Sequence, residues 1–324
     1  MKFLRLTTTE PYLNLAVEEH LFRTADEDVF LLWQNDRTVV IGRNQNAHAE
    51  INTSFTEANG IRIARRITGG GAVYHDLGNL NYTFIATESG DRSIDFATFS
   101  APILDALASL GVNATLSGRN DLEVDGKKIS GCAQHREGDR VLHHGTLLFN
   151  TDLNILTKAL HVDAEKLRAR ALGSVRARVQ NLKPLLNGLA SASELADVIE
   201  RYVTARYGAT AIEPPENAEI DALRLRNASA DWLYPAKGLA AQYTAIRKKR
   251  YPFGSVEAML DLEGNRIRSV AIHGDFFGIR PIAELEALLV GKQLSKAARI
   301  LSACNVSDFI LGMTNRELAE LILE

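Results

Sequence analysis

Three consecutive glycines follow two arginines in residues 65–76, where the sequence reads Arg-Arg-Ile-Thr-Gly-Gly-Gly-Ala-Val-Tyr-His-Asp. Glycine costs backbone entropy on folding, so three in a row need a steric reason. One reason is a ligand that lies against bare backbone N–H groups beside arginine charge, the arrangement expected for a phosphate-bearing molecule. The glycines lack the spacing of the dinucleotide fingerprint, and no P-loop Gly-Lys-Ser/Thr follows. The alternative is a glycine-rich hairpin turn with solvated arginines.

A lysine pair next to a predicted turn is the second candidate for chemistry. Asp125-Gly126 separates two short β-like runs and predicts a hairpin. Strict alternation places Lys128 in the same set as Ser130 and Cys132, and Lys127 in the other set. The pattern does not say which set faces a ligand. A lysine held in a pocket neutralises a carboxylate and a phosphate as they react. The alternative is two surface lysines beside a turn.

Two further segments carry polar groups suited to a site. His143 and His144 are adjacent on a predicted strand, so they point to opposite faces and do not ligate one metal as a pair. No cysteine or carboxylate spacing completes a zinc site, and we therefore expect no metalloenzyme. Residues 173–182 contain Arg176 and Arg178 after a Gly-Ser pair. This segment is either a loop that closes on phosphate or a helix start with exposed arginines.

The elements that must position these groups alternate between short strands and helices. The spacing predicts a helix over 13–23 and another that ends at Gly111, with a third that begins at Ser191 and ends at Gly208. Strands are predicted at 29–33, 38–42, 122–124, 127–130 and 143–150. Residues 72–75 and 81–86 are predicted to form a strand pair joined by the turn at 76–79. So many hairpins favour an α+β fold with a mixed, largely antiparallel sheet over a doubly wound one.

A second, smaller domain is predicted at the C-terminus. The segment Glu213–Glu216 with its two prolines breaks regular structure, and residues 237–250 are polar and basic. Beyond them, two alternating runs around Gly264-Asn265 and a helix from about Pro281 indicate a compact α/β unit. We therefore expect a catalytic domain over residues 1–245 and an accessory domain over 246–324.

Composition limits the classes of partner. The 324-residue chain has a formal net charge of −3, so no global basic field attracts nucleic acid or an anionic membrane. Only two cysteines occur, which argues against a disulfide framework and fits a reducing compartment. No secretory signal and no run of about 20 apolar residues is present. We expect a cytoplasmic protein with no nucleic-acid or membrane partner.

The order of five motifs along the chain resembles the lipoate–protein ligase A family. After the glycine segment come Gly-Arg-Asn-Asp-Leu from Gly118, Gly-Lys-Lys-Ile-Ser-Gly-Cys-Ala-Gln from Gly126, His-His-Gly-Thr-Leu-Leu from His143, and Ser-Val-Arg-Ala-Arg-Val-Gln-Asn-Leu from Ser174. The resemblance extends from about Asn14 to Leu182 and continues into the C-terminal accessory domain through Trp232, the stretch Tyr251–Glu257 and Gly274-Asp275-Phe276-Phe277. It implies the fold of biotin and lipoate ligases.

The family resemblance also implies an activity and a set of site residues. Family members activate lipoate or octanoate with ATP and Mg²⁺ and acylate one lysine of apo lipoyl domains, on 2-oxoacid dehydrogenase E2 subunits or the glycine-cleavage H protein. By motif position, Lys128 would bind both the lipoyl carbonyl and the adenylate phosphate. The residues expected at the nucleotide and acyl-phosphate are Arg66, Gly71, Ala72, Val73, Tyr74, His75, Asn120 and Asp121. Asp121 is also the candidate Mg²⁺ ligand, and the adenylate loop would include Ser174, Arg176, Arg178 and Asn181.

Three other functions fit the same motifs less well. An octanoyltransferase of this fold takes its acyl group from acyl carrier protein or a lipoyl-protein, and one group of these enzymes needs a cysteine three residues before the His-Gly pair. Val141 stands there, and Cys132 is expected to be a buried small residue rather than an acyl carrier. A biotin–protein ligase lacks the long glycine motif found here. A catalytically silent adenylate-binding protein is the remaining alternative, and intact Lys128 and Arg66 argue against it.

Overall fold

The structure, a computed structural model, describes residues 1–88, 94–161 and 178–324. Contacts divide the chain into two compact units. The first comprises Met1–Val40, Ile51–Ala64 and Val73–Ser229, and the second comprises Ile41–Glu50, Arg65–Ala72 and Ala230–Glu324. The second unit therefore includes the arginine–glycine segment of the N-terminal sequence. Our division at residue 245 stays a prediction.

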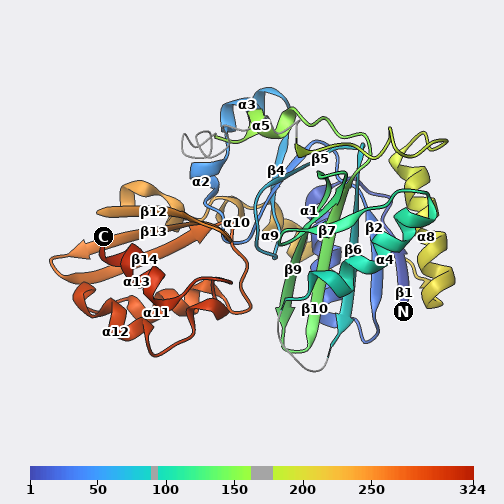
Figure 1. The fold of residues 1–324 in the computed structure, drawn as a ribbon. Helices are drawn as coiled ribbons and strands as arrows, with labels where there is room; N and C mark the ends of the chain where they lie inside the picture. The colour runs from blue at the N-terminus through green and yellow to red at the C-terminus, as the bar shows by residue number, and fades with distance from the viewer. Residues whose placement is uncertain (89–93, 162–177) are drawn as a thin grey trace. The chain divides into compact units, whose positions relative to one another are not determined.

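A mixed sheet of eight strands, in the order β11-β1-β2-β6-β10-β9-β8-β7, forms the centre of the first unit (Figure 1). Its strands are Lys2–Arg5 (β1), Val29–Trp33 (β2), Asn79–Thr87 (β6), Thr115–Ser117 (β7), Asp121–Val124 (β8), Lys127–Glu137 (β9), Arg140–Leu148 (β10) and Thr210–Ala211 (β11). β1 is parallel to both β2 and β11, and the other described pairs of this sheet are antiparallel. The predicted α+β class with a largely antiparallel sheet is confirmed.

Helices cover both faces of this sheet. α1 and α9 pack together on one face, whereas α4 and α8 pack together on the other (Figure 1). Their bounds are Pro11–Thr24 (α1), Phe96–Ser109 (α4), Ala192–Tyr207 (α8) and Ala218–Ala228 (α9). Local signals explain their ends, because Ser191 accepts from Glu194 N at the start of α8 and left-handed Gly208 ends it. Shorter helices are Thr53–Ala58 (α3) and Ile155–Ala159 (α5).

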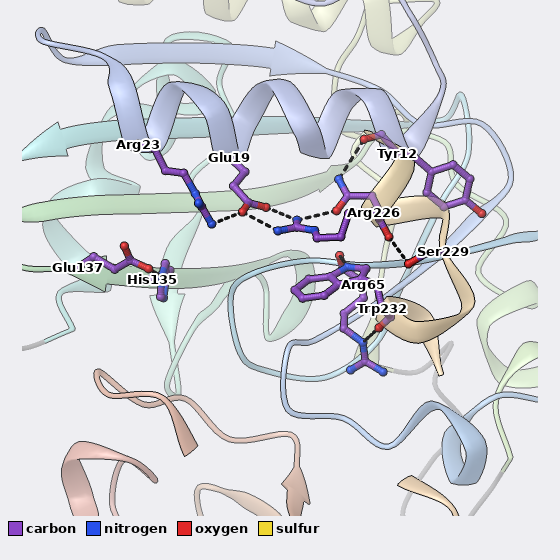
Figure 2. Close-up of polar contacts among 10 residues, drawn as sticks. Tyr12, Glu19, Arg23, Arg65, His135, Glu137, Arg226, Ser229 and Trp232 are labelled. Carbon is purple, nitrogen blue, oxygen red and sulfur yellow. Dashed lines mark hydrogen bonds and ion pairs between the residues drawn. The ribbon is translucent and has the colours of Figure 1, made fainter. Parts of the chain in front are cut away.

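The buried carboxylate of Glu19 on α1 helps to fix α9 against that helix. Glu19 lies between Arg23 of its own helix and Arg226 of α9, and the Arg226 Nη1–Glu19 Oε1 distance is 2.9 Å (Figure 2). Asn227 Nδ2 donates to the Tyr12 carbonyl at 3.1 Å. Because a buried carboxylate is costly unless paired, this network ties the α1–α9 contact to one register.

A second small sheet, in the order β4-β3-β5, contains the strand next to the glycine segment. Its strands are Thr38–Ile41 (β3), Arg62–Arg65 (β4) and Val73–His75 (β5). The predicted pairing of residues 72–75 with 81–86 is wrong, because β5 pairs with β3 while β6 pairs with β2 and β10. The turn between β5 and β6 explains the difference. The Gly78 carbonyl accepts from Phe149 N at 3.0 Å and Asn150 N at 2.8 Å, which directs β6 toward β10.

The C-terminal part of the second unit is a three-stranded antiparallel sheet with helices. The elements are Ala245–Tyr251 (β12), Gly254–Glu263 (β13), Arg266–Gly274 (β14), Ile282–Leu289 (α11), Ala297–Leu301 (α12) and Asn315–Leu323 (α13), with short helices Ala47–Glu50 (α2) and Ala230–Leu233 (α10) from other segments. The predicted turn at Gly264-Asn265 and the helix after Pro281 are confirmed. β12 lies in the basic stretch where no strand was predicted. Within the described residues, none of the helices combines the length and apolar character needed to cross a membrane.

Candidate active site

The Lys128 hairpin has the geometry that Asp125-Gly126 predicts. Both turn residues have positive φ, 51° and 73°, which is the requirement of a type I′ turn. Lys128 pairs with Glu123, but Ser130 pairs with Leu122, so Ile129 is an extra residue in a β-bulge. One extra residue interrupts the alternation along the strand. Side chains before the bulge therefore lie on the opposite face of the sheet from the one that strict alternation predicts. Strict alternation was therefore the wrong rule for Lys128.

The bulge directs Lys128 over Gly131. Its Nζ lies 2.8 Å from the position where a Gly131 Cβ would be, so any side chain there would displace the ammonium. Asp121, which pairs with Gly131, accepts from Lys128 with an Nζ–Oδ1 distance of 2.7 Å. Both side chains are about one-third exposed, at 32% and 33%. The result is a cation that is fixed by a carboxylate and still accessible to a ligand.

Neighbouring groups hold this hairpin end in place. Asn120 exchanges hydrogen bonds with the backbone of Cys132, because its Nδ2 donates to the Cys132 carbonyl and its own carbonyl accepts from Cys132 N at 2.8 Å. Gln180 N donates to the Lys128 carbonyl at 2.9 Å, and Gln180 Nε2 donates to the Val124 carbonyl at 2.8 Å. The chain around Gln180 is thus tied to both strands of the hairpin.

The predicted adenylate loop is only partly within the described residues. Ser174 and Arg176 lie outside them, whereas Arg178 is exposed. Asn181 forms two hydrogen bonds with the backbone of Thr151, each 3.0 Å long. Its carboxamide therefore fixes the end of the segment to the chain after β10.

Arg65 and Arg66 both organise backbone carbonyls within the second unit. Arg65 is buried and donates to five carbonyls, and its burial lowers the pKa of its guanidinium to about 10; the acceptors are Gly42, Arg43, Gln45, Trp232 and Leu233. Figure 2 shows its contact with Trp232. Arg66 donates to Thr68 Oγ1 at 2.8 Å and to the Gly69 and Gly71 carbonyls at 2.7 and 2.8 Å. The alternative of solvated arginines is wrong.

The three glycines differ in why they lack a side chain. A Cβ on Gly69 would lie 2.4 Å from the Phe276 carbonyl, and Gly70 has φ of 90° and donates its N–H to that carbonyl at 3.2 Å. Backbone packing within the unit thus explains two of them. A Cβ on Gly71 would meet only Asp275, at 3.9 Å. Of the three glycines, Gly71 is the one whose missing side chain leaves room for a ligand against the backbone.

Tyr74 and His75 lie on β5 in the first unit, with Val73 half-buried before them. Burial, followed by the charge of Asp76, raises the pKa of Tyr74 to about 12, so its phenol stays protonated. The His75 Nδ1 is 3.1 Å from Asn35 Nδ2, and its ring lies edge-on to Trp33 at 6.0 Å between centroids.

A chain of buried polar groups on the α1 face was missed by sequence reasoning. Trp33 Nε1 donates to Thr83 Oγ1 at 2.9 Å, and Thr83 Oγ1 donates to Glu18 Oε1 at 2.6 Å. His144 Nδ1 lies 2.9 Å from the same carboxylate oxygen. No simple pattern marks Glu18, because α1 also buries Asn14, Glu19 and His20 among its apolar residues.

On the opposite face of the same strands, Cys132 and His143 are packed in the core. Cys132 is buried, with its Sγ 3.1 Å from the Tyr82 hydroxyl and 3.8 Å from those of Ser100 and Ser130. Burial raises the pKa of its thiol, so Cys132 is a protonated core residue, as expected. His143 lies against three aromatic rings, and burial lowers its pKa to about 3.

Two family models match the two parts of the chain. Residues 10–205 match the model of the lipoyl protein ligase A/B catalytic domain, and residues 240–322 match the bacterial lipoate protein ligase C-terminus. The chain belongs to the lipoate–protein ligase family and is an enzyme of the ligase class.

Individual relatives support the assignment over the whole length. The chain is 37% identical to the lipoate-protein ligase LplJ of Bacillus subtilis over 97% of both chains. Among solved structures it is similar to P. falciparum LipL1 in complex with lipoate, with a TM-score of 0.83, 26% identity and 99% of both chains covered. A lipoate-protein ligase A bound with ATP gives a TM-score of 0.61 at 27% identity, over 72% of this chain and 98% of that one. A bipartite ligase of Thermoplasma acidophilum, described with its E2 lipoyl domain, gives 0.64 at 29%, over 72% and 96%.

Proposed function

We propose that this chain activates free lipoate, or octanoate, with ATP and transfers the acyl group to a lysine of an apo lipoyl domain. The acceptors would be 2-oxoacid dehydrogenase E2 subunits or the glycine-cleavage H protein, in the cytoplasm. The observation that supports this most is the Lys128 ammonium, fixed by Asp121 and lying over Gly131. The lipoate, ATP and lipoyl domain named for three related structures are the substrates this chemistry requires.

The first step joins two anions. A carboxylate oxygen of the acid attacks the α-phosphorus of ATP, the bond from that phosphorus to the bridging oxygen breaks, and pyrophosphate leaves. An ammonium has three N–H donors, so the contact with Asp121 leaves donors for the acid and for a phosphate oxygen. Because Asp121 fixes the cation beforehand, little reorganisation is needed when charge develops between the reactants.

The second step forms the amide. The neutral amine of the acceptor lysine attacks the acyl carbon, the bond from that carbon to the phosphate oxygen breaks, and AMP leaves while the amine proton passes to solvent. Lys128 again stabilises charge on the acyl and phosphate oxygens. Its role throughout is electrostatic, and it forms no covalent bond with the substrate.

The other predicted site residues divide into contacting and shaping groups. We propose that Gly71, Ala72 and Val73 offer backbone to the nucleotide, with Tyr74, His75, Asn120 and Arg178 beside it. The bonds of Arg66 to the loop carbonyls support a shaping role in addition to its charge. Asn181, bonded to Thr151, would anchor the adenylate loop, to which we also assign Ser174 and Arg176.

Magnesium has limited support from protein ligands. The described residues contain no group of three or more His, Cys, Asp or Glu that could hold a metal ion. Asp121 alone would contribute one carboxylate, and it already neutralises Lys128. This is not a dedicated Mg²⁺ site, so an ion would depend mainly on the phosphates of ATP. Asp121 as a Mg²⁺ ligand stays a prediction.

The test is the intact mass of an apo lipoyl domain after incubation with this protein, ATP, Mg²⁺ and lipoate. We expect a lipoyl-sized mass increase that disappears when ATP is left out. Acylation from octanoyl-acyl carrier protein or a lipoyl-protein without ATP would instead identify an acyltransferase of this fold. No modification and no pyrophosphate release under any condition would identify a non-catalytic binding protein.

A further inference from the structure

Asn81 on β6 has a buried carboxamide with one unpaired end. The side chain is 2% exposed, and its Oδ1 accepts from Asn79 Nδ2 at 2.8 Å. Its Nδ2 has no hydrogen-bond partner among the residues that the structure describes. A buried unsatisfied donor is energetically costly, and such groups call for an explanation. Asn79 fixes the carboxamide so that the unpaired N–H groups point away from it.

The strand register places Asn81 on the same face as Lys128. Asp121 pairs with Gly131, Gly131 N donates to Thr146 Oγ1 at 3.2 Å, and Thr146 pairs with Asn81. Directly paired residues of neighbouring antiparallel strands share a face. The row therefore runs across β8, β9, β10 and β6, with the Lys128 ammonium over Gly131.

The length of this row matches the substrate. Gly131 and Asn81 are two strands apart, which corresponds to roughly 10 Å. An extended acid of about eight carbon atoms, with bonds of about 1.5 Å, spans a comparable length. If the carboxyl end lies at Lys128, the far end of the acyl chain comes to Asn81. In lipoate this end carries the two ring sulfur atoms, and in octanoate it carries a methyl group.

We propose that Asn81 is a specificity-determining residue that donates a hydrogen bond to the dithiolane ring and favours lipoate over octanoate. The inference rests on the proposed function. Sulfur is a weak acceptor, yet it satisfies an N–H that a methyl group leaves unpaired. A site with a buried polar group discriminates against the analogue that lacks the partner.

The experiment compares three acids in wild type and Asn81→Leu, a substitution of similar shape without polar atoms. The acids are lipoate, octanoate and the pentanoate that carries a cyclopentyl ring, which has the shape of lipoate without sulfur. Pyrophosphate release gives kcat and KM for each acid. We expect kcat/KM for lipoate to fall by about three- to tenfold, mostly through KM, with the other two acids changed less than twofold. Asn81→Ser should show the same pattern if the leucine variant folds poorly.

Tyr82→Phe is the matched control, because Tyr82 is the next residue and faces Cys132 on the opposite side. It should leave the ratio among the acids unchanged. An equal loss for all three acids, or no change for lipoate, would overturn the role of Asn81 while leaving the ligase function intact. If wild type releases no pyrophosphate with any acid, the proposed function fails. In that case, calorimetry measures the Kd of each acid without ATP for wild type and the Asn81 variant. The role of Asn81 predicts that the variant binds lipoate more weakly while its Kd values for the other two acids change little.

Discussion

The two faces of the large sheet carry similar residue types with different consequences. On the α1 face, Lys128 lies over Gly131, and His144 contacts Glu18. On the α4 face, the very next residues along β9 and β10 give Cys132 under Tyr82 and His143 among aromatic rings. Whether a side chain can take part in the reaction therefore depends on the face of the sheet that it occupies. A step of one residue along a strand separates a group that can meet a substrate from one that packs the core.

One bulge creates this difference for Lys128. Without the extra residue Ile129, alternation would direct the ammonium to the face of Cys132. Bulges occur next to active sites because they re-aim a side chain without changing the rest of the sheet. The proximity of Lys128 and Cys132 in sequence thus gives no support to a thiol mechanism.

The largest effect is expected from removing the Lys128 charge. Lys128→Ala should lower the rate of adenylate formation by at least about 100-fold, the typical cost of losing one preorganised group at a reacting centre. Lys127→Ala is the matched control, because Lys127 is exposed at the same hairpin turn. Pyrophosphate release measures the step, and circular dichroism checks the fold. Near-normal turnover by Lys128→Ala would remove the basis for contrasting the two faces.

Because His143 and His144 lie on opposite faces of the sheet, substituting each of them compares the two faces by the change in the free energy of unfolding. His144→Phe leaves the buried Glu18 with the Thr83 hydroxyl as its remaining donor among the described residues, and should lower the free energy of unfolding by about 1–3 kcal/mol. His143→Phe removes a ring whose two nitrogens have no partners among the described residues, so stability near neutral pH should change by less than about 1 kcal/mol. Urea unfolding of both variants measures the difference.

Acid should reduce the stability of wild type more than that of His143→Phe. Burial, followed by the charge of His144, lowers the pKa of His143 from 6.5 to about 3, while Asp95 opposes the shift. As the pH falls below 6.5, the unfolded chain binds a proton at His143 that the native state does not. Wild type should therefore lose about 1.4 kcal/mol per pH unit relative to the variant. Parallel stability curves for the two proteins between about pH 7 and pH 5 would contradict a neutral buried His143.

Local chemistry in the sequence predicted much of the fold and less of the site. The Asp125-Gly126 turn, the ends of α8 and the mixed sheet follow from residue conformational preferences and periodicity. Two features depended on contacts between distant segments. The β5–β6 pairing was wrong because Gly78 binds the chain after β10, and the bulge at Ile129 has no local composition that marks it. Both change which residues share a face, which alternation alone cannot determine.

The arginine–glycine segment shows the same limit. Sequence reasoning assigned the glycines to a ligand, yet the Phe276 carbonyl explains Gly69 and Gly70. These contacts join segments about 200 residues apart in sequence. A steric requirement for glycine was correctly inferred, but its source was visible only once the chain was folded.

The smallest effect is expected at Cys132. Cys132→Ser replaces a protonated, buried thiol by a hydroxyl of similar size that still reaches Tyr82, so ligase activity should stay within about twofold of wild type. Burying a hydroxyl in place of sulfur should cost about 1 kcal/mol of stability. Acylation of a lipoyl domain measures activity, and urea unfolding measures stability. Complete loss of acylation in a folded Cys132→Ser protein would require an acyl-thioester at Cys132. It would mean that the α4 face, rather than the α1 face, contacts the substrate.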